Sequence, residues 1–513
     1  MTKNGSDQRR SVGEWLLAVV WRRPATTLAE RTRRRVTIYL IPYLFFLYIL
    51  AYLDRVNVSV VQSRLQEPVE LGGAGFTREI FGFGSGLFFW GYWILEIPST
   101  VSIVRWGARW VFVRILILWG ICAALEGTIG TPFASYLFGW VPQVPAQYGG
   151  VAEFINGLHN EPKYQFYCFR FMLGFFEGGF FPSVIVYLSL WFRPEDRAKA
   201  IAGFMSAIPL SSMLGVPLSS LLLDVSWLGL PGWRWIFILE GFLPFVFGFV
   251  TLFFLPNDPT RARWLPAEER SWLLAELDRE HQSKQKEGHG LWLHHLGLVL
   301  LLTLIYFLLN VTSYGLSFFL PGIIGSQLHV SDRVAGLLAG PAYVMAFIAI
   351  LLNGWHSDRT GERYWHAAIP MALMSGGLLL AAAVDGVRLV PVFVMIFCVG
   401  TFMYAHLPGF WPIPSKFLGA TVAASAIGFI NMIGNLGGSV GPWIVGKQAS
   451  GQSSFARGLL SIAPWPIIAA AIILLVGYTR PKPRAGEKEK LTDLGLTTSA
   501  SPEFEAGRPG CEA

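Results

Sequence analysis

The chain has 513 residues, of which 53% are hydrophobic and only 14% charged, and its mean hydropathy is +0.48. These values exceed what the core of a soluble protein of this length requires, so we predict a polytopic membrane protein. The formal net charge of +7 is spread over alternate loops, which argues against nucleic acid as its partner.

Apolar runs of about 20 residues, the length that crosses the hydrocarbon core of a bilayer, occur in two groups of six. The first group lies near 36–60, 80–103, 110–130, 165–191, 198–222 and 233–255. The second lies near 296–320, 334–356, 365–384, 389–412, 419–446 and 455–478. We therefore predict an all-α integral membrane protein with twelve transmembrane helices.

A long polar interruption between the two groups defines the expected domains. They are a basic tail at 1–35, a six-helix bundle at 36–256, a central loop at 257–295, a second six-helix bundle at 296–478 and a tail at 479–513. Arginine and lysine gather in the tails, the central loop and alternate loops, so both termini are expected in the cytoplasm. The loop near 130–164 is then an insertion on the outer side, and its role is open.

Cysteine chemistry and metal binding have no support in the sequence. The four cysteines are scattered at Cys122, Cys168, Cys398 and Cys511, without metal-ligand or redox spacing. No cluster of histidine, cysteine or acidic residues has the spacing of a metal site or an activated nucleophile. We therefore expect no metal, no cofactor and no enzymatic activity.

The two halves of the sequence repeat two local patterns, as in transporters built from duplicated halves. The stretch "STVSIVRWGAR" at 99–109 matches "GWHSDRTGER" at 354–363 in an arginine, a glycine two residues later and a final arginine. The stretch "WFRPEDRAKAIAGF" at 191–204 is echoed by "WPIPSKFLGATVAASAIGF" at 411–429. We interpret the halves as copies of one unit.

These motifs resemble a known family. "GWHSDRTGER" fits the G-x-x-x-D-R-x-G-x-R loop signature of the major facilitator superfamily. "AYLDRVNV", "FWGYWILEIPS", "FRFMLGFFEGGFFPSVIVYLSLWF", "RARWLPAEER" and "FWPIPSKFLG" resemble its anion:cation symporter family, which holds bacterial permeases for tartrate, galactonate, phthalate and hydroxyphenylacetate. The resemblance covers roughly residues 36–478. It departs from the family at Val104, where an acidic residue often stands, and in the longer loop at 130–164.

Charged residues inside the first and fourth predicted spans are the strongest functional signal, because an ionisable group within a membrane is costly. Tyr52 and Arg55 share one face of the first helix, and Asp54 lies on the adjacent face. In the fourth span, Glu177 lies two helical turns after Arg170. We expect these spans to bring both carboxylates and both arginines to comparable depth.

A chemical role follows from the residue types. Arg55 is the candidate anion clamp, because a guanidinium stays charged and holds a carboxylate through two parallel hydrogen bonds. Asp54 and Glu177 are candidate proton carriers, and Arg170 is expected as the charge partner of Glu177. The family resemblance supports the same four positions. The alternative is that they form structural ion pairs or helix-end charges that reach the interface.

Further candidates carry weaker signals. Tyr52, Tyr92 and Asn435 are predicted to contact substrate, and the alternative is that such polar groups join helices to one another. Asn310, Tyr314, Asn431 and Glu96 also fall on polar helical faces. The spacing match between the repeated loops predicts an inner gate made of Asp358, Arg359, Arg363, Arg105 and Arg109.

The resemblance implies a monomeric transporter in the plasma membrane, surrounded by the lipid bilayer, which imports a small organic anion together with protons. Transport would proceed by alternating access between the two bundles around a site near the membrane midplane. Two alternatives stay open: an anion exchanger or facilitator without proton coupling, and a non-transporting sensor on the same scaffold.

Overall fold

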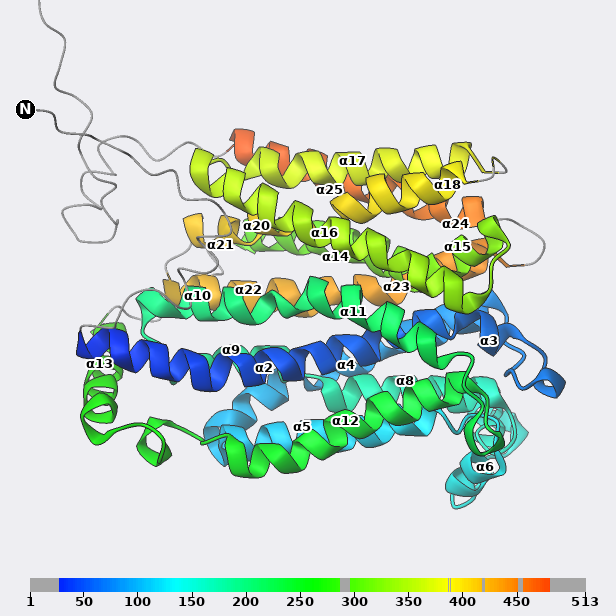
Figure 1. Ribbon diagram of the computed structural model, residues 1–513, viewed down its shortest axis with the longest axis horizontal. Helices are drawn as coiled ribbons and strands as arrows, with labels where there is room; N and C mark the ends of the chain where they lie inside the picture. Colours follow the sequence, from blue (N-terminus) through cyan, green and yellow to red (C-terminus); the bar gives the residue numbers. More distant parts are fainter. Residues whose placement is uncertain are drawn as a thin grey trace, which may run out of the picture.

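The structure, a computed structural model, describes residues 27–286, 296–385, 387, 389–417, 420–450 and 455–479. Within these ranges the chain forms helices and no strand, which confirms the all-α prediction for this part of the chain. Figure 1 shows the long helices running side by side, with those of the first half mostly below those of the second half.

The first half begins with a long helix that is well capped. The Thr27 side chain accepts a hydrogen bond from the Glu30 N–H, and Glu30 accepts one from the Thr27 N–H, which forms a capping box. The helical segments of this half are α2 (Leu28–Val60), α3 (Gln62–Gln66), η1 (Val69–Leu71), α4 (Arg78–Trp106), α5 (Ala108–Glu126), α6 (Pro132–Phe138), η2 (Ala146–Tyr148), α7 (Gly150–Gly157), α8 (Pro162–Glu177), α9 (Phe180–Ser189), α10 (Pro194–Met205), α11 (Ala207–Leu222), η3 (Trp227–Gly229) and α12 (Gly232–Phe254).

A polar connection and the second half follow. The connection contains η4 (Pro259–Arg261) and α13 (Ala267–Lys286). The helical segments of the second half are α14 (Leu296–Ser317), α15 (Leu320–Leu328), α16 (Asp332–Thr360), α17 (Tyr364–Ala383), α18 (Val390–Phe393), η6 (Val394–Gly400), α19 (Thr401–Met403), α20 (Leu407–Phe410), α21 (Pro412–Phe417), α22 (Ala420–Asn435), α23 (Gly437–Gln448), α24 (Phe455–Ile462) and α25 (Pro464–Thr479).

Eleven helical stretches of the described residues are long and apolar enough to span a membrane. They correspond to eleven of the twelve predicted spans. The remaining prediction, at 419–446, falls on α22 and α23, which have 16 and 12 residues and are separated at Leu436. A helix of 16 residues is about 24 Å long, less than the roughly 30 Å of a hydrocarbon core. The count of twelve therefore stays a prediction.

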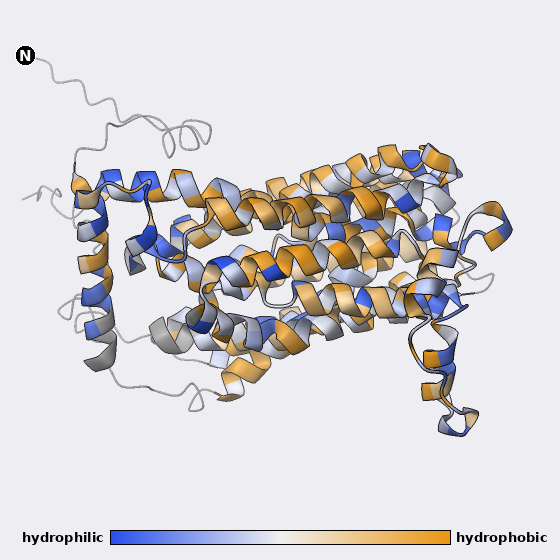
Figure 2. Ribbon diagram, turned by 90° about the horizontal axis from the view of Figure 1, so that it is seen from below, coloured by the Kyte–Doolittle hydropathy of each residue, from blue (hydrophilic) through white to orange (hydrophobic). Residues whose placement is uncertain are grey.

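The distribution of apolar side chains fits a protein embedded in lipid. Figure 2 shows hydrophobic ribbon along most of the length of the bundle and more hydrophilic ribbon at its two ends. Many large apolar side chains of the long helices face outward, and Phe253 of α12 is 88% exposed. Such a surface is unsuited to water and matches a bilayer.

Each of the two repeated loops begins at a glycine with positive φ, although the ψ angles differ, 145° at Gly107 and 3° at Gly361. α4 ends at Gly107, with φ of 85°, and α16 ends at Gly361, with φ of 68°. Both values lie in the region of φ that favours glycine, which explains why each copy of the pattern places glycine two residues after its arginine. The sequence echo therefore marks two helix ends that each place a glycine at positive φ.

The two halves are joined at one end of the bundle, which we call the α6 end; the opposite end, where α2 begins, is the α13 end (Figure 1). At the α6 end, Arg64 Nε lies 2.9 Å from Asp332 Oδ2, and Arg333 Nη1 lies 3.2 Å from Asp224 Oδ2. Arg78 at the start of α4 donates a hydrogen bond of 2.6 Å to the carbonyl of Ala449. These contacts hold the first half against the second at this end.

Candidate functional site

A buried ion pair lies at the centre of the candidate site. Arg55 of α2 and Glu177, the last residue of α8, approach to 2.5 Å between Nη2 and Oε1, and their side chains are 7% and 1% exposed. The Arg55 guanidinium also lies over the rings of Tyr52, Phe88 and Tyr92, at 4.9, 5.0 and 5.2 Å from the ring centres. Aromatic faces attract a cation, so these rings help to hold Arg55 in place.

The pair retains unused hydrogen-bonding capacity. Arg55 Nε and Glu177 Oε2 are both buried and make no hydrogen bond with any described residue. A guanidinium has five donor N–H groups, and Arg55 also donates from Nη1 to the hydroxyl of Tyr314 on α14, at 3.4 Å. The site therefore has free donors beside an aromatic wall that comes from both halves.

Close packing of α8 against α4 brings Glu177 to this position. A Cβ atom at Gly174 of α8 would collide with the carbonyl oxygen of Phe88, so only glycine allows the two backbones to approach this closely. Small residues serve this purpose in many membrane helix pairs. Phe88 and Tyr92 of α4 and Glu177 of α8 thereby meet around the same guanidinium.

Asp54 takes part in a separate buried cluster. Its carboxylate accepts a hydrogen bond of 2.8 Å from Trp119 Nε1 on α5 and one of 3.4 Å from Asn57 Nδ2. Asn57 also donates to Glu240 Oε2 of α12 at 3.0 Å, and Ser219 of α11 donates to Glu240 Oε1 at 2.5 Å. Asp54 is adjacent to Arg55 in the sequence but points to different helices.

Glu240 is a buried carboxyl group that the sequence reasoning missed. It carries the same signal as Asp54, since it is a single acid within an apolar span, "WIFILEGFLPF". Within the described part of the chain, neither Asp54 nor Glu240 forms an ion pair with an arginine or lysine. The two carboxyl groups instead share one amide donor, Asn57.

Arg170 has a different partner from the one predicted. Its Nη1 lies 3.4 Å from both carboxylate oxygens of Glu126, the last residue of α5, and both side chains are fully buried. Glu177 pairs with Arg55 instead. Arg170 and Glu177 are two turns apart on one helix, about 10 Å, whereas α5 packs beside α8 and presents Glu126 directly to Arg170. Glu126 was not among the predicted residues.

The second-half residue that contacts Arg55 is Tyr314, whereas Asn435 is the second-half residue predicted to contact substrate. Asn435 receives a hydrogen bond of 3.4 Å from Asn310, which also donates to the carbonyl of Gly434 at 3.1 Å. These bonds join α14 to α22, as in the alternative interpretation of Asn435 as a contact between helices. The second-half hydroxyl that contacts Arg55 belongs to Tyr314, and Tyr52 lies 3.5 Å from it.

One further hydrogen bond crosses between the halves. Asn431 of α22 donates to Glu96 Oε1 of α4 at 2.9 Å, and both side chains are buried. The second oxygen, Glu96 Oε2, is buried without a hydrogen-bond partner among the described residues. Glu96 and Tyr92 lie one turn apart on α4, so this bond is close to the aromatic wall around Arg55.

The predicted gate residues of the second half bind within their own loop. Asp358 Oδ1 lies 2.7 Å from Arg363 Nη2, and Arg363 Nη1 donates to Ser357 Oγ at 2.8 Å. The guanidinium of Arg359 lies 5.5 Å from the centre of the Trp355 ring. In this conformation Asp358 therefore forms its ion pair with a residue of its own half, Arg363.

The predicted gate residues of the first half contact the end of α12. The Arg109 backbone N–H donates to Asn257 Oδ1 at 2.9 Å, and Arg109 Nε donates to the Leu255 carbonyl at 2.7 Å. Arg105 is exposed. The gate interaction between Arg105 or Arg109 and Asp358 therefore stays a prediction for another conformation.

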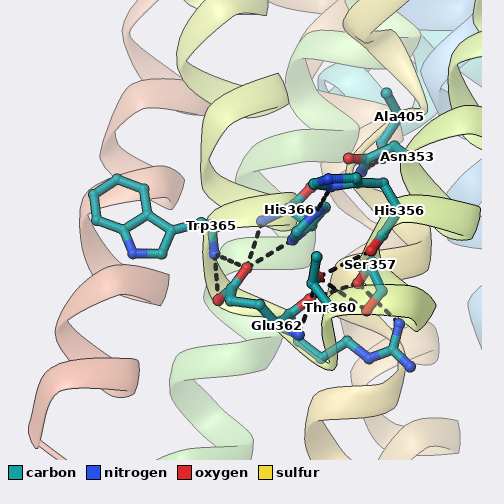
Figure 3. Close-up of polar contacts among 9 residues, drawn as sticks. Asn353, His356, Ser357, Thr360, Glu362, Trp365, His366 and Ala405 are labelled. Carbon is teal, nitrogen blue, oxygen red and sulfur yellow. Dashed lines mark hydrogen bonds and ion pairs between the residues drawn. The ribbon is translucent and has the colours of Figure 1, made fainter.

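A hydrogen-bonded chain of three side chains stabilises the loop beside Asp358 (Figure 3). His366 Nδ1 lies 2.7 Å from Glu362 Oε2, and His356 Nδ1 lies 2.6 Å from His366 Nε2. The Glu362 carboxylate also accepts the backbone N–H groups of Trp365 and His366 at the start of α17, at 2.9 and 3.1 Å. Burial raises the pKa of Glu362, but these hydrogen bonds outweigh it and hold the pKa below the usual glutamate value.

Comparison with known proteins relates this chain to membrane transporters of one superfamily. The sequence pattern of the Major Facilitator Superfamily matches residues 44–442. A putative tartrate transporter of Agrobacterium vitis is 35% identical over 89% of this chain and 93% of its own length. A quinolone resistance transporter of Acinetobacter baumannii is 32% identical over 83% of this chain and 90% of its own length.

Solved structures support the same fold. A bacterial homologue of the human lysosomal transporter Spinster, in an inward-facing and occupied conformation, superposes with a TM-score of 0.65. The match covers 87% of this chain and 98% of that one, at 16% sequence identity. At this identity the likeness bears on the arrangement of helices alone.

Proposed function

Because the chain belongs to the Major Facilitator Superfamily and is a multi-pass membrane transporter, we propose that it imports a small organic anion together with protons. The buried Arg55–Glu177 ion pair is the observation that carries this proposal. The name of the tartrate relative supports an anionic substrate, since tartrate has two carboxylate groups.

In the proposed mechanism Arg55 exchanges one carboxylate partner, that of Glu177, for another, that of the substrate. When Glu177 binds a proton, it no longer compensates the charge of Arg55, and a substrate carboxylate can take its place through two parallel hydrogen bonds. Removing one member of a buried ion pair costs about 3–5 kcal/mol. The exchange avoids this cost, because Arg55 has a carboxylate partner both before and after substrate binds.

Asp54 is proposed as a second proton carrier. It lies one residue from Arg55, is buried, and has hydrogen-bond donors but no ion-pair partner within the described residues. A buried carboxyl group without a cation is stabilised by binding a proton. Tyr52, Tyr92 and Tyr314 contribute the rings and hydroxyl groups that surround Arg55, and they favour a substrate with hydroxyl or aromatic groups near its carboxylate.

The direction of opening follows from the contacts between the halves. The arginines at the start of α2 identify the α13 end as cytoplasmic by the positive-inside rule. The polar contacts described above join the halves at this end, the outer one in our proposal, and they support an inward-facing state of an alternating-access cycle. Asp358 pairs with Arg363 of its own half and forms no ion pair with Arg105 or Arg109 among the described residues, as expected of an open inner gate.

Transport measurements on reconstituted vesicles test the proposal. A thermal-shift screen of organic acids, with tartrate as the first probe, identifies the substrate. An imposed pH gradient, acid outside, is expected to drive accumulation of that substrate by the natural protein. Glu177→Gln, which resembles the protonated side chain, is expected to lose this accumulation but to retain exchange of external for internal substrate.

The control is Glu70→Gln, which removes an exposed carboxylate from the short segment η1 and is expected to behave like the natural protein. If Glu177→Gln concentrates substrate on the pH gradient as well as the natural protein does, the proposed coupling is refuted. If the natural protein itself shows only exchange, the protein is an anion exchanger.

A further inference from the structure

A second candidate site lies at the α13 end, away from Arg55. A cavity of about 630 Å³ is formed by the start of α2, the end of α12 and the segment before α13. Its lining residues are Arg31, Arg34, Arg35, Ile38, Tyr39, Phe254 and Trp264. Tyr39 and Arg55 are 16 residues apart on α2, which corresponds to about 24 Å along the helix. The cavity is therefore separate from the proposed transport site.

Three arginines form one side of this cavity, and two glutamates of α13 compensate them only in part. Arg35 makes two hydrogen bonds to Glu269, of 2.9 and 3.2 Å. Arg31 Nη2 is 3.9 Å from Glu268, and both side chains are exposed, so this ion pair is weak. Arg34 forms no ion pair with any described residue. The cavity thus offers at least one uncompensated guanidinium and a second that is loosely held.

The other side of the cavity is aromatic and apolar. The Tyr39 ring stacks between Phe254 and Trp264, with ring centres 4.5 and 4.1 Å away. Ile38, one residue before Tyr39, is 57% exposed. Trp264 Nε1 is buried and has no hydrogen-bond acceptor among the described residues. Charge on one side and an exposed apolar surface on the other suit a ligand that is itself amphipathic.

The position of the cavity indicates the source of such a ligand. α2 and α12 are both candidate membrane spans, and the cavity lies where the basic start of α2 gives way to its apolar part. Aromatic residues are typical of this depth in a membrane. Clusters of arginine beside a membrane span attract anionic lipids, and the guanidinium group matches the geometry of phosphate.

We propose that this cavity binds the phosphate headgroup of an anionic phospholipid from the leaflet at the α13 end. Arg31 and Arg34 contact the phosphate, and the acyl chains run along Ile38 and the outer surfaces of α2 and α12. The lipid ties the start of α2 to α12 and to the segment that leads into α13. Bound lipid therefore stabilises the first half of the protein.

Thermal unfolding of the purified, delipidated protein tests this proposal. Titration with phosphatidylglycerol is expected to raise the Tm, whereas phosphatidylcholine and inorganic phosphate are expected to leave it nearly unchanged. In the double variant Arg31→Gln/Arg34→Gln, the phosphatidylglycerol concentration that gives half of the shift is expected to rise about tenfold or more, because two basic groups are lost.

Two further variants keep the test decisive. Arg34→Gln breaks no ion pair with a described residue, so it reports on lipid binding even if the double variant is unstable. Arg263→Gln removes an exposed arginine at the same end that does not line the cavity, and it is expected to retain the full response. An equal Tm shift with phosphatidylcholine or inorganic phosphate, or an unchanged response in both Arg34 variants, would overturn the proposal.

Discussion

At the scale of single residues, the role that we propose for a charged side chain depends more on the group it contacts than on its residue type. Asp54 and Arg55 are neighbours in the sequence, yet one joins Trp119 and Asn57 and the other joins Glu177. Successive residues on a helix point about 100° apart, so they face different neighbouring helices. This separation allows one short motif to contribute both Arg55, the proposed anion-binding group, and a second carboxyl group, Asp54.

Glu362 provides a prediction about pH. Glu362→Ala removes the acceptor of two N–H groups at the start of α17, which is expected to lower stability by about 0.5–2 kcal/mol at neutral pH. The pKa of Glu362 is lower in the folded protein than in the unfolded chain, so its contribution is present above the unfolded-state pKa and is lost as the pH falls through the folded-state value. The measurement is the Tm of both proteins across the acid range.

The difference in Tm between the natural protein and Glu362→Ala should therefore persist from neutral pH down to the usual glutamate pKa and shrink below it. Glu70→Ala, at an exposed position, is the control and should show little difference at any pH. A difference that did not shrink at the acid end of the range would contradict the assignment of Glu362 as an ionised cap.

At the scale of elements, the approach of α4 to α8 positions the ion pair. Gly174→Ala is expected to push the two backbones apart, because the added methyl group would collide with the carbonyl of Phe88. Overpacking of this kind costs about 1–3 kcal/mol. Substrate affinity should fall as well, since Glu177, Phe88 and Tyr92 would shift relative to Arg55.

Gly376→Ala is the matched control. Gly376 lies within α17, and a Cβ atom there has no neighbour within 4 Å. The substitution should be neutral or slightly stabilising, because alanine favours the helix more than glycine does. Equal effects of the two substitutions on Tm and on substrate affinity would show that the α4–α8 contact does not position the site.

At the scale of the whole molecule, the ion pairs at the α6 end are expected to favour the inward-facing form of the proposed alternating-access cycle. Arg64–Asp332 and Arg333–Asp224 join the halves, and their side chains are partly exposed. Pairs of this kind contribute about 0.2–1 kcal/mol each. The two pairs together amount to about 0.4–2 kcal/mol, so Arg64→Gln together with Arg333→Gln should raise the ratio of the form open at the α6 end to the form closed there by about 2- to 30-fold.

Spin labels report this population. Cysteines introduced at Leu221 on α11 and Val334 on α16, two exposed positions at the α6 end, give the distance between the halves in a background without native cysteines. The double variant should increase the fraction of long distances. Arg279→Gln, which breaks an ion pair within α13 alone, should leave the distances unchanged. The proposed role of these ion pairs fails if both variants give the same distribution.

Much of the site was predictable because a charge within an apolar span is rare. Asp54, Arg55 and Glu177 were recognised in this way, and the structure places all three in the buried interior. Glu240 and Glu126 carry the same signal and were passed over. The partner of Arg170 could not be predicted, because distance along α8 does not reveal that Glu126 of α5 lies opposite it.

The sequence by itself determined the helical class, the membrane environment and the family, because the length and apolar character of a span are properties of a continuous segment. The positive φ at Gly107 and Gly361 was also a local property, because glycine adopts such a φ at little cost. Only the tertiary structure decided which carboxylate pairs with Arg55, that Tyr314 reaches it from the second half, and that ion pairs join the halves at the α6 end. These depend on contacts between helices distant in sequence, where a rotation of one helix by a single residue changes every partner.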